Sequence, residues 1–318
     1  MADTAKVWTI REVLNWTGGY LQRAQIEQPR LEAELLLGKA LGRTRVELYM
    51  DLDRPLEATE LSAYRSLIRH RADRIPTAYL LGEKEFMSLA FKVNRSVLIP
   101  RPETEVLVEW AIRHLEEFAP EREERPLLVA DVGTGSGNIA VTLAKRFANV
   151  QVTAIDLSPD ALEVARQNAA LHGVERRIEF LEGDLLGSVR DKRQGFDLIA
   201  ANLPYIAAGD LPHLPREVLY EPIAALDGGK DGLALYRKLV PQVVELLAPR
   251  GVLLLELGSG QARAAGRLFS PESWEPVRVI PDYAGHDRVL IARRKSPPRR
   301  VLRPVMRAGR PGPDPVRT

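Results

Sequence analysis

Cysteine is absent from the 318 residues of this chain. Its absence excludes disulfide bonds, zinc sites built on cysteine and catalysis by a thiol. The five histidines show no spacing typical of metal ligands, so we expect no metal site. No apolar run approaches the roughly 20 residues that span a bilayer, and the first residues lack the charged-then-apolar pattern of a secretion signal. These absences predict a protein without membrane attachment, located in the cytoplasm.

The net charge of the chain is small, and it is unevenly distributed. The formal net charge is +2, but residues 296–318 contain six Arg and one Asp and carry +5, so residues 1–295 sum to −3. A basic surface is the usual footprint of a nucleic-acid-binding protein, and we therefore do not expect the folded core to bind nucleic acid. With six Pro among its 23 residues, 296–318 is predicted to be a disordered basic tail.

The first quarter of the chain has the signals of a small helical bundle. Thr9 and Glu12 form a capping box, which predicts that a helix begins there. Another helix is expected to begin at Pro29 and to stop near Gly42. We predict an N-terminal helical domain over 1–78.

The rest of the chain changes period twice. Apolar and polar residues alternate in 79–99, which predicts a β-hairpin linker. In 100–295 strands alternate with helices, and runs such as Val252–Leu255 suit strands buried on both faces. This pattern predicts a doubly wound α/β domain with a mostly parallel, seven-stranded Rossmann-like sheet. The expected strands cover residues 127–132, 150–157, 178–181, 198–201, 252–257, 277–280 and 289–292.

A glycine-rich turn, Asp131–Gly137, follows the first of these strands. Glycine lets the backbone approach a ligand closely, and the N-terminus of a helix favours an anionic group. The spacing G-x-G-x-G differs from the dinucleotide fingerprint, and no G-x-x-x-x-G-K-[ST] loop occurs. For this segment alone, a nucleotide site and a simple strand–helix turn both remain open.

The next two strands end in acidic residues. Asp156 lies 23 residues beyond Gly133, where a carboxylate can accept the hydroxyls of a ribose. Asp184 could receive an adenine amino group, and Leu185 could face its ring. Three successive strand ends of this kind predict a nucleoside site, and the pattern resembles class I methyltransferases, which implies S-adenosylmethionine as cofactor. The predicted cofactor-binding residues are Asp131, Gly133, Thr134, Gly135, Ser136, Gly137, Asp156, Leu157, Asp184, Leu185 and Asn202.

The tetrapeptide Asn202-Leu203-Pro204-Tyr205 ends the fourth strand and faces the same crevice by the rule for open sheets. An amide nitrogen is a poor nucleophile because its lone pair is delocalised. The side-chain carbonyl of Asn202 and the backbone carbonyl of Leu203 can each accept one N–H and so orient the nitrogen. Pro204 fixes the backbone, and Tyr205 can pack on a planar acceptor. We predict that these four residues are catalytic and bind an amide or amine nitrogen; a polar turn with a buried aromatic is the alternative.

Several further segments occur in order between about residues 75 and 293. They include P-T-A-Y-L-L-G from Pro76, V-L-I-P-R-P-E-T-E from Val97, Phe196–Ile206, Y-E-P-I-A-A-L-D-G-G-K-D-G from Tyr220, and G-H-D-R ending at Arg288. Together with the glycine turn, the set resembles the release-factor glutamine N5-methyltransferases.

The resemblance implies a substrate and a partner. The acceptor would be the side-chain amide of the glutamine in the Gly-Gly-Gln loop of class 1 peptide chain release factors. Residues 1–78 would bind the release factor, and 100–295 would be the methyltransferase catalytic domain. Arg101 and Glu103 would border the substrate pocket. We expect the enzyme to be a monomer.

One residue departs from the family's usual motif, Asn-Pro-Pro-Tyr, because Leu203 stands in its second position. Asn-Leu-Pro-Tyr resembles the motif of ribosomal RNA adenine N6-dimethylases. An adenine-N6 methyltransferase acting on RNA or DNA is therefore the alternative enzyme, and a non-catalytic binding module is the alternative outside enzymes. Leu203 can supply the same backbone carbonyl, although it lacks the fixed φ of proline.

Overall fold

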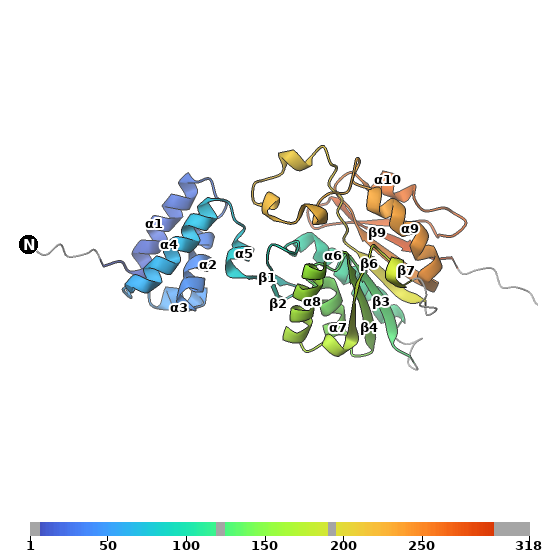
Figure 1. Ribbon diagram of the computed structural model, residues 1–318, viewed down its shortest axis with the longest axis horizontal. Coiled ribbons are helices and arrows are strands. Elements are labelled where there is room, and N and C mark those ends of the chain that lie inside the picture. Colours follow the sequence, from blue (N-terminus) through green and yellow to red (C-terminus); the bar gives the residue numbers. More distant parts are fainter. Residues whose placement is uncertain (1–6, 119–124, 190–194, 296–318) are drawn as a thin grey trace, which may run out of the picture.

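The N-terminal part of the computed structural model is a bundle of helices that stands beside a larger α/β part (Figure 1). The structure describes residues 7–118, 125–189 and 195–295. The tail predicted over 296–318 lies outside the described residues. Helices of the bundle are α1 (Ile10–Arg23), α2 (Pro29–Leu41), α3 (Arg45–Met50), α4 (Ala58–Ala72) and α5 (Thr77–Leu81).

Local sequence signals set the helix ends in the bundle. The backbone N–H of Thr9 donates to the Glu12 carboxylate at 3.0 Å, and the Thr9 hydroxyl accepts from the Glu12 N–H at 3.3 Å, which confirms the predicted capping box. Pro29 occupies the first turn of α2, and Gly42 ends it with a φ of +61°. The bundle core is apolar and includes the fully buried Tyr64, whose hydroxyl donates to the carbonyl of Ala33.

A short antiparallel pair, β1 (Glu83–Phe86) and β2 (Leu89–Lys92), follows α5. Phe86 and Phe91 are buried in the same hydrophobic cluster as the α/β sheet and its helices. The pair therefore packs as part of the α/β core. It covers less of the chain than the hairpin predicted over 79–99, because α5 takes the start of that segment and residues 93–99 form no strand.

The α/β part contains the seven-stranded, mostly parallel sheet that the sequence predicted, and the strand order is β5-β4-β3-β6-β7-β9-β8. The strands β3 to β7 pair in parallel, and β9 runs antiparallel to both of its neighbours, β7 and β8. Its strands are β3 (Leu127–Val132), β4 (Val150–Asp156), β5 (Ile178–Glu182), β6 (Phe196–Ala201), β7 (Leu247–Glu256), β8 (Arg278–Pro281) and β9 (Asp287–Arg293). Its helices are α6 (Pro102–Phe118), α7 (Asn138–Arg146), α8 (Pro159–Leu171), α9 (Ala234–Leu246) and α10 (Ala262–Gly266).

Helices cover both faces of the sheet (Figure 1). Successive side chains of β6 belong to different clusters: Leu198 packs with the cluster that contains residues of α6 and α7, and Ile199 packs with the cluster that contains residues of α9. A strand alternates its side chains between faces, so strands buried on both faces must be apolar throughout. The predicted apolar run Val252–Leu255 lies in β7 and is buried along its whole length.

The direction of winding reverses at β3. This strand pairs with β4 on one side and with β6 on the other, and all three are parallel. Ligands of open α/β sheets bind outside the carboxyl ends of the strands at such a point. The long connection from β6 to α9, residues 202–233, crosses this edge of the sheet and contains only short 3-10 turns.

The helical bundle contacts the α/β part through that same connection. Arg71 and Arg74, both near the end of α4, form ion pairs with Glu217 at 3.4 and 3.0 Å. The hydroxyl of Tyr220 donates to the backbone carbonyl of Asp73 at 2.9 Å. Residues 217–220 therefore bridge the bundle and the sheet edge where the strand order reverses. Within the described ranges, no helix is long and apolar enough to cross a membrane.

Candidate active site

A cavity of about 370 Å³ lies at the carboxyl ends of β3, β4 and β6. It brings together the ends of the strands that the sequence singled out, as well as the loop before α6 and the β6–α9 connection. The predicted residues that line it are Arg101, Gly133, Thr134, Gly135, Ser136, Asp156, Leu157, Asp184, Leu185, Asn202, Leu203 and Pro204.

The buried Asp131 stabilises the glycine turn by hydrogen bonds. This carboxylate is fully buried, and its Oδ2 accepts the Thr134 hydroxyl at 2.6 Å and the Ala140 N–H at 3.1 Å. Burial raises the pKa of Asp131 to about 7, although these two hydrogen bonds act in the other direction. Asp131 therefore shapes the turn and the start of α7 and does not line the cavity itself.

Asp156, at the end of β4, connects the turn with the next helix. Its Oδ2 accepts the Gly135 N–H at 2.8 Å, and its Oδ1 accepts the Ser158 N–H at 2.9 Å. Burial raises the pKa of Asp156 against these backbone hydrogen bonds. Each carboxylate oxygen still has a lone pair, so Asp156 can accept two hydroxyl protons from a ligand in the cavity.

Leu185 has a left-handed backbone, with a φ of +55°. This conformation is uncommon for a residue with a branched side chain and is found most often where the surroundings require it. Here it follows Asp184 at the cavity wall, where the side chain of Leu185 is buried among apolar neighbours. The strained position places an apolar side chain beside an acidic one, which suits a nucleobase.

The acceptor tetrapeptide begins where β6 ends. The Nδ2 of Asn202 donates to the hydroxyl of Thr104 at 3.0 Å. Thr104 therefore does not occupy the Oδ1 of Asn202, and this oxygen is available to the cavity. Leu203 is almost fully buried, and its Cδ2 would lie 2.9 Å from a Cβ added to Gly133. The acceptor loop and the glycine turn are therefore in direct contact, and that contact needs glycine at 133.

Tyr205 points away from the cavity. Its hydroxyl donates to Oε1 of Glu256 at 3.3 Å, and burial together with Glu256 raises the pKa of the Tyr205 hydroxyl. The hydroxyl of the fully buried Tyr236 lies 2.5 Å from the carbonyl oxygen of Glu256 and 3.3 Å from that of Leu203, so the two carbonyls share its single proton. Tyr205 thus anchors the tetrapeptide, in place of the predicted packing on the acceptor.

The rim of the cavity is closed by an ion pair. Arg101 contacts the buried carboxylate of Glu221, which also accepts the Ile99 N–H at 3.0 Å. This pair joins the loop before α6 to the β6–α9 connection. Glu103 lies in the first turn of α6 and does not line the cavity.

Gly137 was predicted to bind the cofactor, but this N-cap residue of α7 does not line the cavity. Sequence reasoning also missed part of the site. Thr104 lines the cavity and bonds Asn202, although the sequence shows it only as one residue of a helix start. The described part of the chain contains no group of three or more His, Asp or Glu placed to share a metal ion.

The chemistry of the cavity fits a nucleoside that carries an amino acid. A Cβ added at Gly135 would meet no atom within 4 Å, so the turn leaves open space beside the start of α7. Asp156 offers acceptors to a ribose, and Asp184 with Leu185 offers an acceptor and an apolar wall to a base. The Asn202 carbonyl lies at the same cavity, where a second, nitrogen-bearing substrate can reach it.

Comparisons with known proteins show the family of the chain. Residues 12–82 match the family described as PrmC N-terminal domain, and residues 129–219 match the family described as methyltransferase domain. The catalytic domain of hMettl16 in complex with an RNA hairpin has a similar fold. Its TM-score is 0.52 at 14% identity, and the match covers 72% of this chain and 81% of that one.

Two curated relatives match almost the whole chain. The release factor glutamine methyltransferase of Geobacter sulfurreducens is 46% identical over 294 residues, which is 92% of this chain and 99% of the relative. That of Moorella thermoacetica is 42% identical over 289 residues, which is 91% of this chain and 99% of the relative. By this identity and coverage, the chain belongs to the release factor glutamine methyltransferase family.

Proposed function

We propose that this protein transfers a methyl group from S-adenosylmethionine to the side-chain amide nitrogen, N5, of the glutamine in the Gly-Gly-Gln loop of class 1 peptide chain release factors. The observation that carries the proposal is the position of Asn202. Its side-chain carbonyl is available at the cavity that the glycine turn, Asp156 and Asp184 also line. Family membership supports glutamine in a release factor as the acceptor.

The cavity residues have complementary tasks toward the cofactor. S-adenosylmethionine supplies, when bound, an electrophilic methyl group on a sulfonium sulfur. Asp156 would accept the ribose hydroxyls, and Asp184 with Leu185 would hold the adenine. Gly133 and Gly135 add no side chain at their positions in the turn, so the N-terminus of α7 can receive the carboxylate of the methionine part.

Asn202 and Leu203 would orient the acceptor nitrogen. The Oδ1 of Asn202 and the carbonyl of Leu203 each accept one N–H, which fixes the amide plane and directs the lone pair toward the methyl group. The carbonyl of Leu203 already accepts the Tyr236 hydroxyl at 3.3 Å and retains a second lone pair. No strong base is needed before attack, because the nitrogen becomes acidic as it is methylated.

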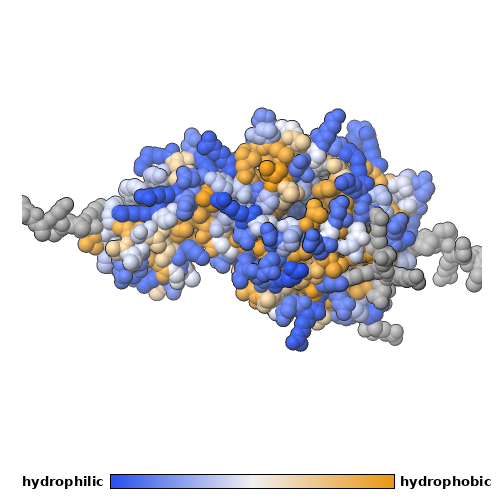
Figure 2. All heavy atoms as spheres, in the orientation of Figure 1, coloured by the Kyte–Doolittle hydropathy of each residue, from blue (hydrophilic) through white to orange (hydrophobic). Residues whose placement is uncertain are grey.

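The surface around the cavity supports a protein substrate over a nucleic acid. Figure 2 shows hydrophobic atoms gathered over the β6–α9 connection, where Leu219 and Ile223 are exposed. Pro222 and Ala225 of the same connection line the cavity. An apolar rim excludes water from a protein contact, whereas phosphate groups require basic side chains. We further propose that the enzyme works as a monomer in the cytoplasm, where its release factor acts.

Label transfer tests the proposed activity. The protein and methyl-labelled cofactor are incubated separately with a release factor, with the Gln-to-Ala variant of its Gly-Gly-Gln loop, and with ribosomal RNA. We expect label in the release factor alone. Label in RNA and none in protein would assign the adenine-N6 activity to which Asn202-Leu203-Pro204-Tyr205 is also suited.

Replacement of Asn202 separates acceptor binding from cofactor binding. Asn202→Ala is expected to abolish methyl transfer and to leave the dissociation constant of the cofactor within about twofold, because the Asn202 carbonyl is used by the acceptor. Isothermal titration measures the second quantity directly. A large loss of cofactor affinity would instead assign Asn202 to the cofactor site.

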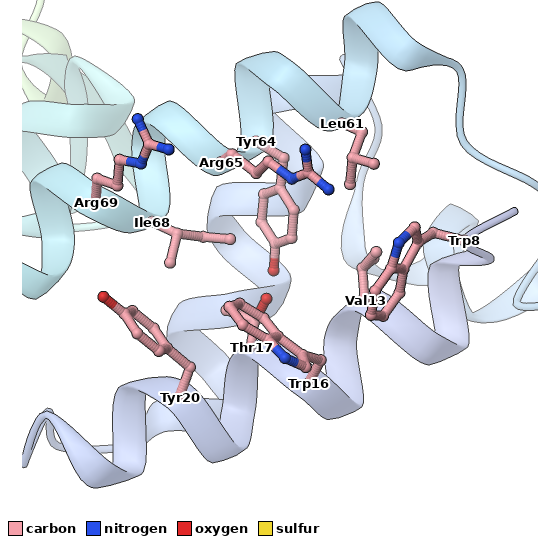
Figure 3. A pocket seen from close by; sticks show the side chains of 10 residues that line it. All are labelled: Trp8, Val13, Trp16, Thr17, Tyr20, Leu61, Tyr64, Arg65, Ile68 and Arg69. Carbon is pink, nitrogen blue, oxygen red and sulfur yellow. The ribbon is translucent and has the colours of Figure 1, made fainter. Parts of the chain in front are cut away.

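We also propose that the helical bundle binds the release factor in a groove between α1 and α4. Figure 3 shows the groove, a cavity of about 290 Å³ lined by Trp16 and Tyr20 on one side and by Arg65 and Ile68 on the other. The rings of Trp16 and Tyr20 stack at 5.2 Å, and Trp16 is half exposed. Among the described residues, Arg65 and Arg69 form no ion pair. Aromatic rings beside free guanidinium groups suit an acidic segment with an apolar anchor.

Kinetics with a groove variant tests the docking proposal. Trp16→Ala combined with Arg65→Glu is expected to raise the KM for the release factor roughly tenfold and to leave kcat unchanged, because the groove is remote from Asn202. Met50→Ala, an exposed apolar position on α3 outside the groove, is the matched control. A KM equal to that of the control would refute docking at this surface.

A further inference from the structure

Two buried groups that the proposed mechanism has not used lie behind the side chain of Asn202: one contacts Asn202, and the second contacts the first. Thr104, in the first turn of α6, accepts a hydrogen bond from Asn202 at 3.0 Å and is almost fully buried. Glu256, the last residue of β7, is fully buried, and the Thr104 side chain hydrogen-bonds to its carboxylate. Three elements that are distant in the sequence therefore converge behind the acceptor tetrapeptide.

An asparagine side chain has two ends with opposite hydrogen-bonding character. The carbonyl of Asn202 accepts, its NH₂ group donates, and rotation by a half turn about the last bond exchanges them. Only the carbonyl can bind an acceptor N–H. A hydroxyl partner such as Thr104 does not decide between the two orientations by itself, because a hydroxyl can both donate and accept.

Glu256 removes this ambiguity. A carboxylate is an acceptor only, so it takes the single hydroxyl proton of Thr104. Thr104 then has only lone pairs left for Asn202 and must accept from its NH₂ group. The NH₂ group of Asn202 therefore points toward Thr104, and the carbonyl of Asn202 faces the cavity.

We propose that Glu256, acting through Thr104, is a positioning residue that sets which end of the Asn202 amide faces the acceptor nitrogen. The inference rests on the proposed function for the identity of the acceptor. The chain of donors and acceptors itself involves only residues of this protein.

The same arrangement makes the orientation sensitive to protonation of Glu256. Burial raises the pKa of Glu256 to about 7, while Thr104, Arg288 and Tyr205 lower it and Glu103 raises it further. Its Oε2 is buried and has no hydrogen-bond partner among the described residues. Once protonated, Glu256 can donate to Thr104, whose own proton then turns toward Asn202 and favours the carbonyl as partner. The carbonyl is thereby withdrawn from the cavity.

Steady-state kinetics at saturating cofactor gives the first test. Thr104→Val is expected to lower kcat roughly 10- to 100-fold, with cofactor affinity unchanged, and Thr104→Ser is expected to restore kcat to within about threefold. The wild-type kcat should fall about tenfold for each pH unit below 7, and Glu256→Gln should show a lower kcat that does not vary between pH 6 and 8. Asp131→Asn should keep the acid limb, which separates Glu256 from the other buried acid at this site.

Selective nitrogen-15 labelling of asparagine gives a test that does not depend on activity. The chain has six asparagines, so the side-chain signals of Asn202 can be assigned by their loss in Asn202→Ala. In the wild-type protein these signals should shift between pH 6 and 8, and in Glu256→Gln they should not.

The two tests fail in different ways. If the wild-type protein labels no release factor, the proposed function is refuted, and the asparagine signals still decide the inference. Asn202 signals that ignore pH in the wild-type protein, or that shift equally in Glu256→Gln, would overturn it. An unchanged kcat in Thr104→Val would overturn it as well.

Discussion

Gly228 presses the β6–α9 connection against the acceptor tetrapeptide, and its replacement by alanine should disable the enzyme. A Cβ added at Gly228 would lie 2.7 Å from both Tyr205 Cα and Gly232 Cα. Both obstacles are backbone atoms, so no side chain can rotate away. To reach ordinary van der Waals contact, the two segments must separate by roughly 0.7 Å or more.

The size of the effect follows from that displacement. Overpacking of this kind costs about 1–3 kcal/mol of unfolding free energy. Because Tyr205 belongs to the tetrapeptide, the shift moves the groups that we propose to orient the acceptor, and a misplacement near 1 Å costs on the order of 100-fold in rate. We therefore expect Gly228→Ala to lower kcat by about two orders of magnitude and to leave cofactor affinity nearly intact.

Single-turnover methyl transfer, cofactor titration and chemical denaturation measure the three quantities. Gly209→Ala is the matched control, because this glycine lies in the same connection and a Cβ added to it meets no atom within 4 Å. Should Gly228→Ala transfer methyl groups as fast as Gly209→Ala, the tetrapeptide is not held by this contact, and the argument is wrong.

Three further predictions concern the walls of the cavity. Leu203→Pro should keep activity, because the Leu203 N–H donates no hydrogen bond in the described part of the chain. Leu203→Ala should lower the free energy of unfolding by about 2–3 kcal/mol, because it empties a buried site. A Leu203→Ala variant as stable as the wild type in denaturation would contradict this. Burial raises the pKa of Asp131 from 3.8 to about 7, so the folded state binds the proton more tightly and this group makes stability fall as pH rises through that interval. The free energy of unfolding of Asp131→Asn should therefore increase relative to that of the wild type between pH 5 and 8. A difference between the two proteins that does not change with pH would refute the assignment. Glu221→Gln should weaken the rim pair with Arg101 and raise the KM for the release factor more than it lowers kcat; an unchanged KM would mean that the rim does not meet the substrate.

The architecture of the sheet could be predicted because each of its parts has a local signal. The predicted strand over 127–132 matches β3, and the predicted helix start at Pro29 matches α2, since burial on two faces and proline at a helix start are properties of short segments. The helix α3 was missed, although Thr44 and Glu47 form a capping box that indicates it. The boundary between domains at 78 stays a prediction.

The supporting groups of the site could not be predicted in the same way. Glu256 appears in the sequence only as the end of an apolar run, and Thr104 only as one residue among the glutamates of a helix start. Their roles depend on contacts between elements about 100 to 150 residues apart, which no local pattern encodes. For the same reason the sequence could not tell that Tyr205 turns toward Glu256 and that Asp131 lies beneath the turn.

The bridge at 217–220 has a consequence for how this protein can be recombined with its relatives. Glu217 holds Arg71 and Arg74 of the bundle, and four residues later Glu221 holds Arg101 at the cavity rim. A chimera that exchanges only the N-terminal helices would combine the arginines of one parent with the glutamate of the other. Functional hybrids should therefore carry the bundle and residues 217–221 from the same parent, as a single unit of inheritance split across the chain.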